Sequence, residues 1–272
     1  FFQRHLAEHF ADLGYAFYAI DLRKCGRSIR PGQTPHYTTD LARYDLELGL
    51  ALDKVAADAG GSVLAMAHST GGLVVPLWLD RMNRRRDPSL AKVTGLVLNS
   101  PWFDLQGHAM LRNVAVSGVI GAVGRLRGHS VVPSAAIDTY GASIHAGRSG
   151  EWDYDLDWKP LAGFPVRFGW LHAIRAGHRR LHRGLDVGVP AMILRSKLSV
   201  RAKRYGPEVD VADAVLDVRQ IQRWAGCLGQ RTTIVPIPDA RHDVFLSTEP
   251  VRTHAFAELA TWLDWLRDHA RS

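Results

Sequence analysis

The residues of this chain that could do chemistry begin with Ser69, in the stretch Ala67-His68-Ser69-Thr70-Gly71. A short apolar run of strand type, Val63–Met66, precedes this serine, and an apolar run with helical spacing starts at Leu73. The pattern predicts a strand, a sharp turn and a helix. A serine on such a turn exposes its hydroxyl, and residues two positions to either side must be small because strand and helix approach closely. The stretch is typical of a nucleophilic serine; the alternative is a glycine-rich turn whose serine caps the helix.

A serine hydroxyl is a weak nucleophile until a base removes its proton, and the base needs an acid that orients it. His242 can supply the base, since it follows the last predicted strand and precedes the last predicted helix. Its alternative role is that of an ordinary histidine in a surface loop. The candidate acids lie in one segment between the serine and the histidine, which supplies Glu208, Asp210, Asp213 and Asp217. Most of these carboxylates must be solvated or helix-capping groups.

Short apolar strands alternate with amphipathic helices in both halves of the chain. The first half predicts helices over Phe2–Leu13, Asp40–Ala56 and Leu73–Met82, and strands over Tyr15–Ile20, Val63–Met66 and Val93–Leu98. The second half predicts strands over Val189–Leu194 and Thr232–Ile237, and helices over Val218–Leu228 and Val251–His269. This alternation indicates an α/β fold, with a mostly parallel sheet covered by helices on both faces.

The alternation stops at about Phe103 and resumes near Asp186. The intervening segment holds an apolar, glycine-rich patch, Val114–Val123, and an aromatic stretch, Trp152–Trp170. We interpret this segment as an inserted cap. The predicted organisation is a first core part over residues 1–105, a cap over 106–185 and a second core part over 186–272. The apolar patch could face lipid, line an acyl tunnel or pack within the cap.

The charge, the cysteines and the apolar runs of the sequence restrict the classes of protein to which the chain can belong. Lys and Arg number 34 against 27 Asp and Glu, which gives a net charge of +7. Most of the arginines are scattered, and no nucleic-acid-binding signature accompanies them, so we predict no nucleic-acid partner. The two cysteines lie far apart in the sequence, which argues against a disulfide framework and favours a cytoplasmic location. No apolar run reaches the roughly 18 residues that a membrane span needs.

Two patterns resemble metal sites but lack their full ligand sets. His178 and His182 have a spacing that suits zinc, yet they lie among arginines with no glutamate in the expected place. Asp153, Asp155 and Asp157 alternate as in a calcium loop, but the glycine and terminal glutamate of that loop are missing. We therefore expect neither a metal ion nor an organic cofactor.

Four motifs together resemble the monoglyceride-lipase and lysophospholipase branch of the α/β-hydrolases, which is grouped with serine aminopeptidase-like hydrolases. Residues 67–72 are similar to that branch's G-H-S-x-G-G, and residues 240–243 to its G-x-H-E. Residues 21–28 resemble its D-x-R-G-x-G-x-S loop, and residues 213–217 its acid segment, D-x-x-V-D. The resemblance covers essentially the whole chain. It implies an α/β-hydrolase fold with an inserted cap.

The same resemblance implies roles for four residues. Ser69 would be the nucleophile, His242 the base and Asp213 the acid, with Asp217 and then Asp210 as the less favoured acids. Thr70 N–H would donate to the oxyanion. Ala67 and Lys24 stand where the branch has glycine, and a longer segment precedes the acid. The branch's first strands and its His-Gly oxyanion loop would precede Phe1, so we expect the natural protein to be longer and to carry that motif upstream.

The expected function is that of a serine hydrolase that cleaves carboxylic esters of the monoacylglycerol or lysophospholipid kind through an acyl-enzyme. The aromatic cap favours a greasy acyl chain, and it could make transient contact with a membrane surface. One alternative is a peptidase or thioesterase with small substrates. Another is a catalytically silent α/β-hydrolase that binds a ligand or partner.

Overall fold

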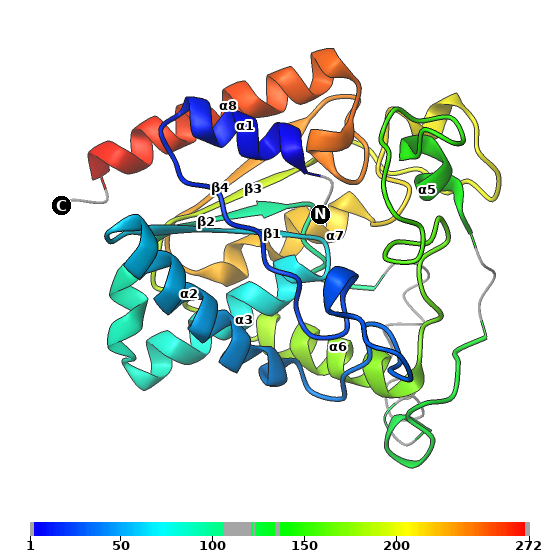
Figure 1. Cartoon of the computed structure of the whole chain (residues 1–272), viewed down its shortest axis with the longest axis horizontal. Helices are drawn as coiled ribbons and strands as arrows, with labels where there is room; N and C mark the ends of the chain where they lie inside the picture. Colours follow the sequence, from blue (N-terminus) through cyan, green and yellow to red (C-terminus); the bar gives the residue numbers. More distant parts are fainter. Residues whose placement is uncertain (1–2, 106–120, 122, 134–136, 270–272) are drawn as a thin grey trace.

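The computed structural model describes residues 3–105, 121, 123–133 and 137–269. At its centre lies a sheet of four parallel strands in the order β1-β2-β3-β4 (Figure 1). The strands are β1 (Val63–His68), β2 (Val93–Asn99), β3 (Ala191–Ser196) and β4 (Thr232–Ile237). Each strand pairs with the next one along the chain, so each connection must cross over a face of the sheet. The predicted parallel sheet is confirmed.

Helices cover both faces of this sheet. On one face lie α1 (Arg4–Asp12) and α8 (Glu249–His269), and on the other lie α2 (Asp45–Ala59), α3 (Gly71–Arg85) and α6 (Phe168–Leu181) (Figure 1). The short helices are α5 (Thr139–Ile144) and α7 (Val218–Trp224). Single 3-10 turns are η1 (Gly26–Ser28), η2 (Leu41–Tyr44), η3 (Pro88–Lys92), η5 (Pro207–Val209), η6 (Ala225–Leu228) and η7 (Val244–Leu246).

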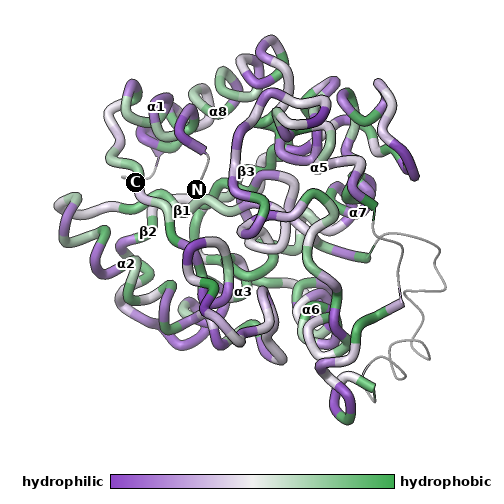
Figure 2. Tube along the Cα trace, turned by 45° about the vertical axis from the view of Figure 1, so that its right-hand side comes forward, coloured by the Kyte–Doolittle hydropathy of each residue, from purple (hydrophilic) through white to green (hydrophobic). Residues whose placement is uncertain are grey.

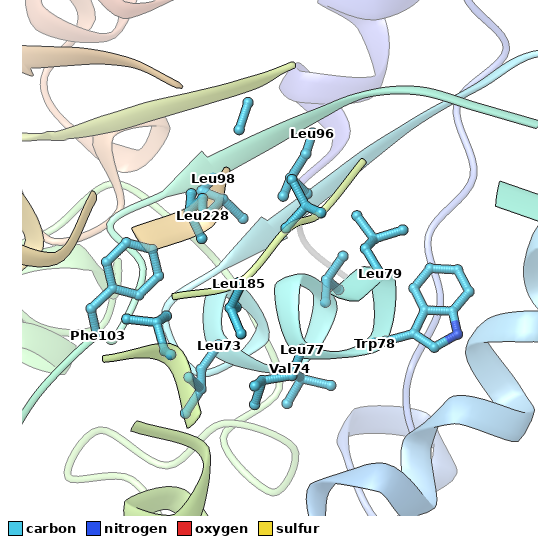
Figure 3. Packing of buried hydrophobic residues seen from close by; sticks show 14 of the residues in the cluster. Leu73, Val74, Leu77, Trp78, Leu79, Leu96, Leu98, Phe103, Leu185 and Leu228 are labelled. Carbon is cyan, nitrogen blue, oxygen red and sulfur yellow. The ribbon is translucent and has the colours of Figure 1, made fainter. Parts of the chain in front are cut away.

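The two faces of the sheet have separate apolar cores, because successive strand residues point to opposite sides. Leu96 and Leu98 of β2 pack against α3, together with Leu73 and Leu79 of that helix (Figure 3). Val97, between the two leucines, belongs instead to the core under α8. Apolar residues accordingly follow one another along β2 and β3 without alternation, as is typical of strands buried on both faces. Figure 2 shows these strands mainly in green, whereas purple is common in the outer loops and on α1 and α2.

The strand predicted over Tyr15–Ile20 is wrong. Its apolar composition suits a buried strand, but Tyr18 is 46% and Ile20 49% exposed, and no ladder pairs the segment with any strand of the described chain. A strand exists only where a neighbour supplies backbone hydrogen bonds, and composition does not reveal the neighbour. Within the described residues, β1 also pairs on one side only, with β2, and all six of its residues are half-buried.

Helix α6 packs directly on the core, although it lies within the segment predicted as a cap. Ala173, Ile174 and Leu181 belong to the same apolar cluster as α3. At Gly177 the helices are so close that a Cβ would lie 3.0 Å from the side chain of Leu77. The division into two core parts and a cap stays a prediction. Most of the patch Val114–Val123 lies outside the described residues.

The carboxyl ends of all four strands meet at one edge of the sheet, since the strands are parallel. Loops at this edge bring together residues from distant parts of the sequence, and such edges are where α/β proteins bind ligands. Ser69 follows β1, Ser100 follows β2 and His242 follows β4. No helix among the described residues is long and apolar enough to cross a membrane.

Candidate active site

Ser69 lies on a sharp turn between β1 and α3, as predicted. Its φ angle is +53°, a left-handed backbone conformation that residues other than glycine rarely adopt. Two backbone hydrogen bonds hold the turn in place: Ser69 N–H donates to the carbonyl of Asn99, and Trp102 N–H donates to the carbonyl of Ser69, each at 3.0 Å. The loop after β2 therefore fixes the serine, and such local strain is typical of functional sites.

The spacing around the turn explains why alanine is tolerated at position 67. A Cβ placed on Gly71 would lie 3.6 Å from the Cβ of Ala67, which is ordinary van der Waals contact. The tight approach is one residue further on. A Cβ placed on Gly72 would lie 2.6 Å from the Cβ and 2.7 Å from the Cα of Pro101. Gly72, rather than Ala67 or Gly71, is the position that cannot carry a side chain.

Replacing Gly72 by alanine is therefore expected to lower the free energy of unfolding by about 1–3 kcal/mol, because the backbone at Pro101 must move to admit the methyl group. Gly71→Ala is the matched control, one residue away in the first turn of α3. We expect it to change stability by less than about 1 kcal/mol, since alanine is the better helix former and meets no clash. Urea unfolding of both variants measures the difference, and equal stabilities would contradict the steric argument.

The structure brings Ser69, His242 and Asp213 into one chain of hydrogen bonds. The distance from His242 Nε2 to Ser69 Oγ is 2.9 Å, and the distance from His242 Nδ1 to Asp213 Oδ2 is also 2.9 Å. Because a carboxylate can only accept, Nδ1 donates to Asp213 and leaves Nε2 to accept from the serine hydroxyl. The side chains of His242 and Asp213 are buried, at 3% and 0% exposure. These hydrogen bonds have the order that a serine nucleophile, its base and its acid require.

Asp213 is fixed by its own loop. Its Oδ1 accepts hydrogen bonds from the backbone N–H groups of Val215 at 2.8 Å and Leu216 at 2.7 Å. A parallel bridge with Ser199 ties its backbone to the segment after β3. With Oδ1 occupied by two donors, Oδ2 is directed to His242.

The other two candidate acids, Asp217 and Asp210, interact with residues other than His242. Asp217 caps α7 by accepting from Arg219 N–H, and it forms an ion pair with the Arg219 side chain. Asp210 forms an ion pair with Arg241 and accepts from the hydroxyl of Tyr205. Both carboxylates therefore have partners of their own, as the sequence reasoning expected of most acids in this segment. Asp213 alone of the three is hydrogen-bonded to His242.

Thr70, the residue predicted to donate to an oxyanion, forms the N-terminal cap of α3. Its backbone N–H has no backbone acceptor among the described residues, whereas the N–H groups of Ser69 and Gly72 donate to the carbonyls of Asn99 and Ser69. An unused amide beside a serine hydroxyl, at the positive end of a helix dipole, can stabilise negative charge on a substrate oxygen.

Asp243, the residue after His242, is a second buried carboxylate. The sequence alone assigned it no role. Asp243 accepts hydrogen bonds from Gln3 at 2.9 Å and from Asn99 at 2.6 Å. Burial acts to raise the pKa of Asp243, but the nearby His68 and these two donors outweigh it and hold the pKa below its ordinary value. The available signal was a polar residue, Asn99, at the carboxyl end of an otherwise apolar strand.

His68 lies beside the catalytic candidates without joining their hydrogen bonds. Its ring centroid is 4.7 Å from that of His242, and its Nδ1 donates to the carbonyl of Asn99 at 3.0 Å. Burial lowers the pKa of His68 to about 4. His68 is thus neutral near pH 7, so His242 can accept a proton without facing a second positive charge.

His178 and His182, which have the spacing of zinc ligands, anchor the loop after β2 instead. Their Nε2 atoms donate to the carbonyls of Trp102 and Phe103 at 2.9 and 2.8 Å. The ring of His182 also stacks on Trp224, with 3.6 Å between centroids. Within the described residues, no group of three or more potential ligands could hold a metal ion. These two histidines therefore have a structural role, and they hold the loop that in turn holds Ser69.

The sequence of this chain matches the model of one known protein family. A sequence model of the family described as serine aminopeptidase, S33, matches residues 2–198. A search of curated protein sequences finds no match.

Solved structures with the same fold include two lipases. One is a soluble variant of monoglyceride lipase from Saccharomyces cerevisiae in complex with a substrate analogue: TM-score 0.70, 18% identity, covering 97% of this chain and 82% of that one. Another is monoacylglycerol lipase from Paleococcus ferrophilus: TM-score 0.64, 17% identity, covering 97% of this chain and 89% of that one. At these identities the likeness establishes the α/β-hydrolase fold.

Proposed function

Because the chain belongs to the serine aminopeptidase S33 family of α/β-hydrolases, we propose that it is a serine hydrolase that cleaves carboxylic esters of monoacylglycerol or lysophospholipid type through an acyl-enzyme. The observation that carries the proposal is the hydrogen-bonded chain from Ser69 through His242 to Asp213. The two lipases of the same fold support the substrate class, since their names give monoglycerides as substrates.

In the proposed reaction, Ser69 Oγ attacks the ester carbonyl while its proton passes to His242 Nε2, 2.9 Å away. Asp213 holds the imidazole in the required tautomer and stabilises its positive charge. The carbonyl oxygen becomes an oxyanion that accepts from Thr70 N–H. His242 then returns the proton to the departing alcohol, which leaves the acyl group on Ser69. Water, deprotonated by His242, releases the acid and regenerates the serine.

Charge in the neighbouring cavity favours an esterase over an aminopeptidase. An enzyme that removes N-terminal residues must bind the substrate's ammonium group, which calls for an unpaired carboxylate. Asp21 is the only carboxylate among the described residues that line the cavity beside Thr70, and it is already paired with Arg27 at 2.5 Å. The alternative of a silent binding protein receives no support from the site, since the three hydrogen-bonded side chains are all present.

Two finer proposals concern where the protein acts. Cys25 and Cys227 are both free thiols, which supports a reducing compartment such as the cytoplasm. A transient contact with a membrane surface has support from Leu126, which is 85% exposed and lies between Arg125 and Arg127. An exposed apolar side chain among cations suits an anionic lipid surface.

The proposed function is tested with a panel of ester, thioester and aminoacyl substrates. An ester of glycerol and the matching thioester, each with acyl chains from two to eighteen carbons, are offered to the protein beside aminoacyl amides that carry a free ammonium group. We expect the esters to be hydrolysed with the highest kcat/KM, and the rate to rise with chain length. A protein that prefers the amides, or that turns over none of the three and is not labelled by a fluorophosphonate, contradicts the proposal.

A further inference from the structure

A cavity of about 370 Å³ opens beside the serine turn, and Thr70 is part of its wall. The rest of the wall comes from the loop that carries Asp21 and His36, from the segment between α5 and α6, and from Trp170 of α6. Most of this wall is apolar, through side chains such as Trp158, Phe164 and Trp170. The hydrocarbon part of an ester bound at Ser69 can lie against it.

Two cations interrupt this apolar wall, Lys159 and Arg167. The ammonium of Lys159 lies 5.4 Å from the centre of the Tyr140 ring, and within the described chain no carboxylate is within 4.0 Å of it. Arg167 donates to the backbone carbonyl of His129, again with no described carboxylate as a partner. By contrast, the charge of Asp21 is matched by Arg27. The buried carboxylate of Asp243 acts on the charge of Lys159 without forming an ion pair with it, so both cations of the cavity lack an ion-pair partner among the described residues.

Lys159 is also close to the proposed chemistry. The ring of Tyr140, which it faces, lies edge-on to His242 with 5.3 Å between centroids. One aromatic ring thus separates the ammonium from the proposed base. Burial lowers the pKa of Lys159, and the nearby charge of Asp243 acts in the opposite direction without outweighing it, so the ammonium is held in this position at a cost. An anion bound in the cavity would offset that cost.

His36 adds no third positive charge to the cavity. It lines the same cavity and packs against Phe164, with 5.1 Å between ring centroids. Burial, and secondarily the charge of Lys159, lower the pKa of His36, so its ring is neutral near pH 7. It can donate or accept a hydrogen bond beside the two cations.

We propose that Lys159, assisted by Arg167, binds a negatively charged group of the substrate, so that the preferred substrates are acyl esters bearing a phosphate or carboxylate near the ester bond. This inference rests on the proposed ester hydrolysis and makes it more specific. The apolar wall contacts the hydrocarbon and the two cations contact the anion, while the ester bond reaches Ser69 beside Thr70 of the same wall. A neutral monoacylglycerol fills the same cavity but gives neither cation an anionic partner, which an anionic ester would supply.

The test compares three esters that share one acyl chain: the ester of glycerol, of glycerol phosphate and of glyceric acid. The variants are Lys159→Met, which removes the charge and keeps the length, and Lys159→Arg, which keeps the charge. Lys54→Met is the matched control, because Lys54 is exposed on α2 outside the cavity. Wild type is expected to show a kcat/KM about tenfold or more higher for at least one anionic ester than for the neutral one. The better of the two anionic esters identifies phosphate or carboxylate as the group recognised.

In Lys159→Met this ratio is expected to fall about tenfold, to recover largely in Lys159→Arg and to stay unchanged in Lys54→Met. An equal loss for charged and neutral esters would show that Lys159 only supports the structure and would overturn the inference. So would a wild type without preference for either anionic ester, and both results leave ester hydrolysis standing.

A binding measurement keeps the inference testable without turnover. The Ser69→Ala protein, loaded with the ether analogue 1-O-alkylglycerol 3-phosphate or its uncharged 1-O-alkylglycerol counterpart, reports affinity by calorimetry. Tighter binding of the phosphate, lost on adding Lys159→Met, supports the inference even if the proposed hydrolysis fails. Equal affinities for the two ethers, together with equal kcat/KM for the three esters, refute it.

Discussion

Replacing Ser69 by alanine is expected to lower kcat/KM for ester hydrolysis by about 10⁴-fold or more and to abolish labelling by a fluorophosphonate. Alanine keeps the turn and the packing but lacks the oxygen on which the acyl group is formed. The residual rate comes from substrate binding and from the backbone amide of Thr70, neither of which the change removes. Steady-state kinetics on the preferred ester and gel detection of the probe measure both effects.

The matched control is Ser100→Ala. Ser100 follows the neighbouring strand β2 at the same edge of the sheet, and it too has a positive φ angle, +45°. It is fully buried, and its hydroxyl has no hydrogen-bond partner among the described residues. Removing this hydroxyl should leave labelling and hydrolysis near the wild-type level. Labelling that survives in Ser69→Ala but disappears in Ser100→Ala would mean that the nucleophile has been assigned to the wrong serine.

Asp213→Asn is expected to cost about 10⁴-fold in kcat while leaving the fold intact. An asparagine amide offers a hydrogen where Asp213 Oδ2 now accepts from His242 Nδ1. The imidazole then takes the other tautomer, and Nε2 can no longer accept the proton of Ser69. The remaining oxygen of the amide can still accept from Val215 and Leu216, so the loop keeps its shape.

Asp217→Asn provides the control from the same segment. Asparagine caps a helix about as well as aspartate, so α7 keeps its first turn, and only the exposed pair with Arg219 is lost. We expect kcat within about twofold of wild type, because this carboxylate does not contact His242. If Asp217→Asn lost as much activity as Asp213→Asn, the acid would have to be reassigned.

The features that could be predicted from the sequence are mostly local. The turn at Ser69 is determined by residues within a few positions, an apolar strand before it and small residues around it, and the structure has the predicted strand–turn–helix. The helix over Val251–His269 and the strand over Thr232–Ile237 have strong periodicity or composition of their own, and both are present. By contrast, the segment Tyr15–Ile20 has the composition of a strand and no partner in the described sheet.

Long-range contacts account for the rest. Four acids lie between positions 208 and 217, and only the resemblance of residues 213–217 to a family motif ranked Asp213 first, since each acid can cap a turn or pair with a nearby arginine. The choice among them depends on a contact with His242, 29 residues from Asp213. The hydrogen bond between Asp243 and Asn99, separated by 144 residues, could not be predicted for the same reason. Lys159 lies in a segment without periodicity, where no pattern indicates which neighbours a side chain will meet.

The ladder between β2 and β3 has a consequence for how the protein acquires its reactivity. It has four residue pairs, against six in each of the other two ladders. Ser69 follows β1, on one side of this β2–β3 ladder. Asp213 and His242 follow β3 and β4, on its other side. Closing the long segment between β2 and β3 costs more chain entropy than forming either local strand–helix unit. The proposed nucleophile therefore meets its proposed base and acid only when the two halves of the sheet join.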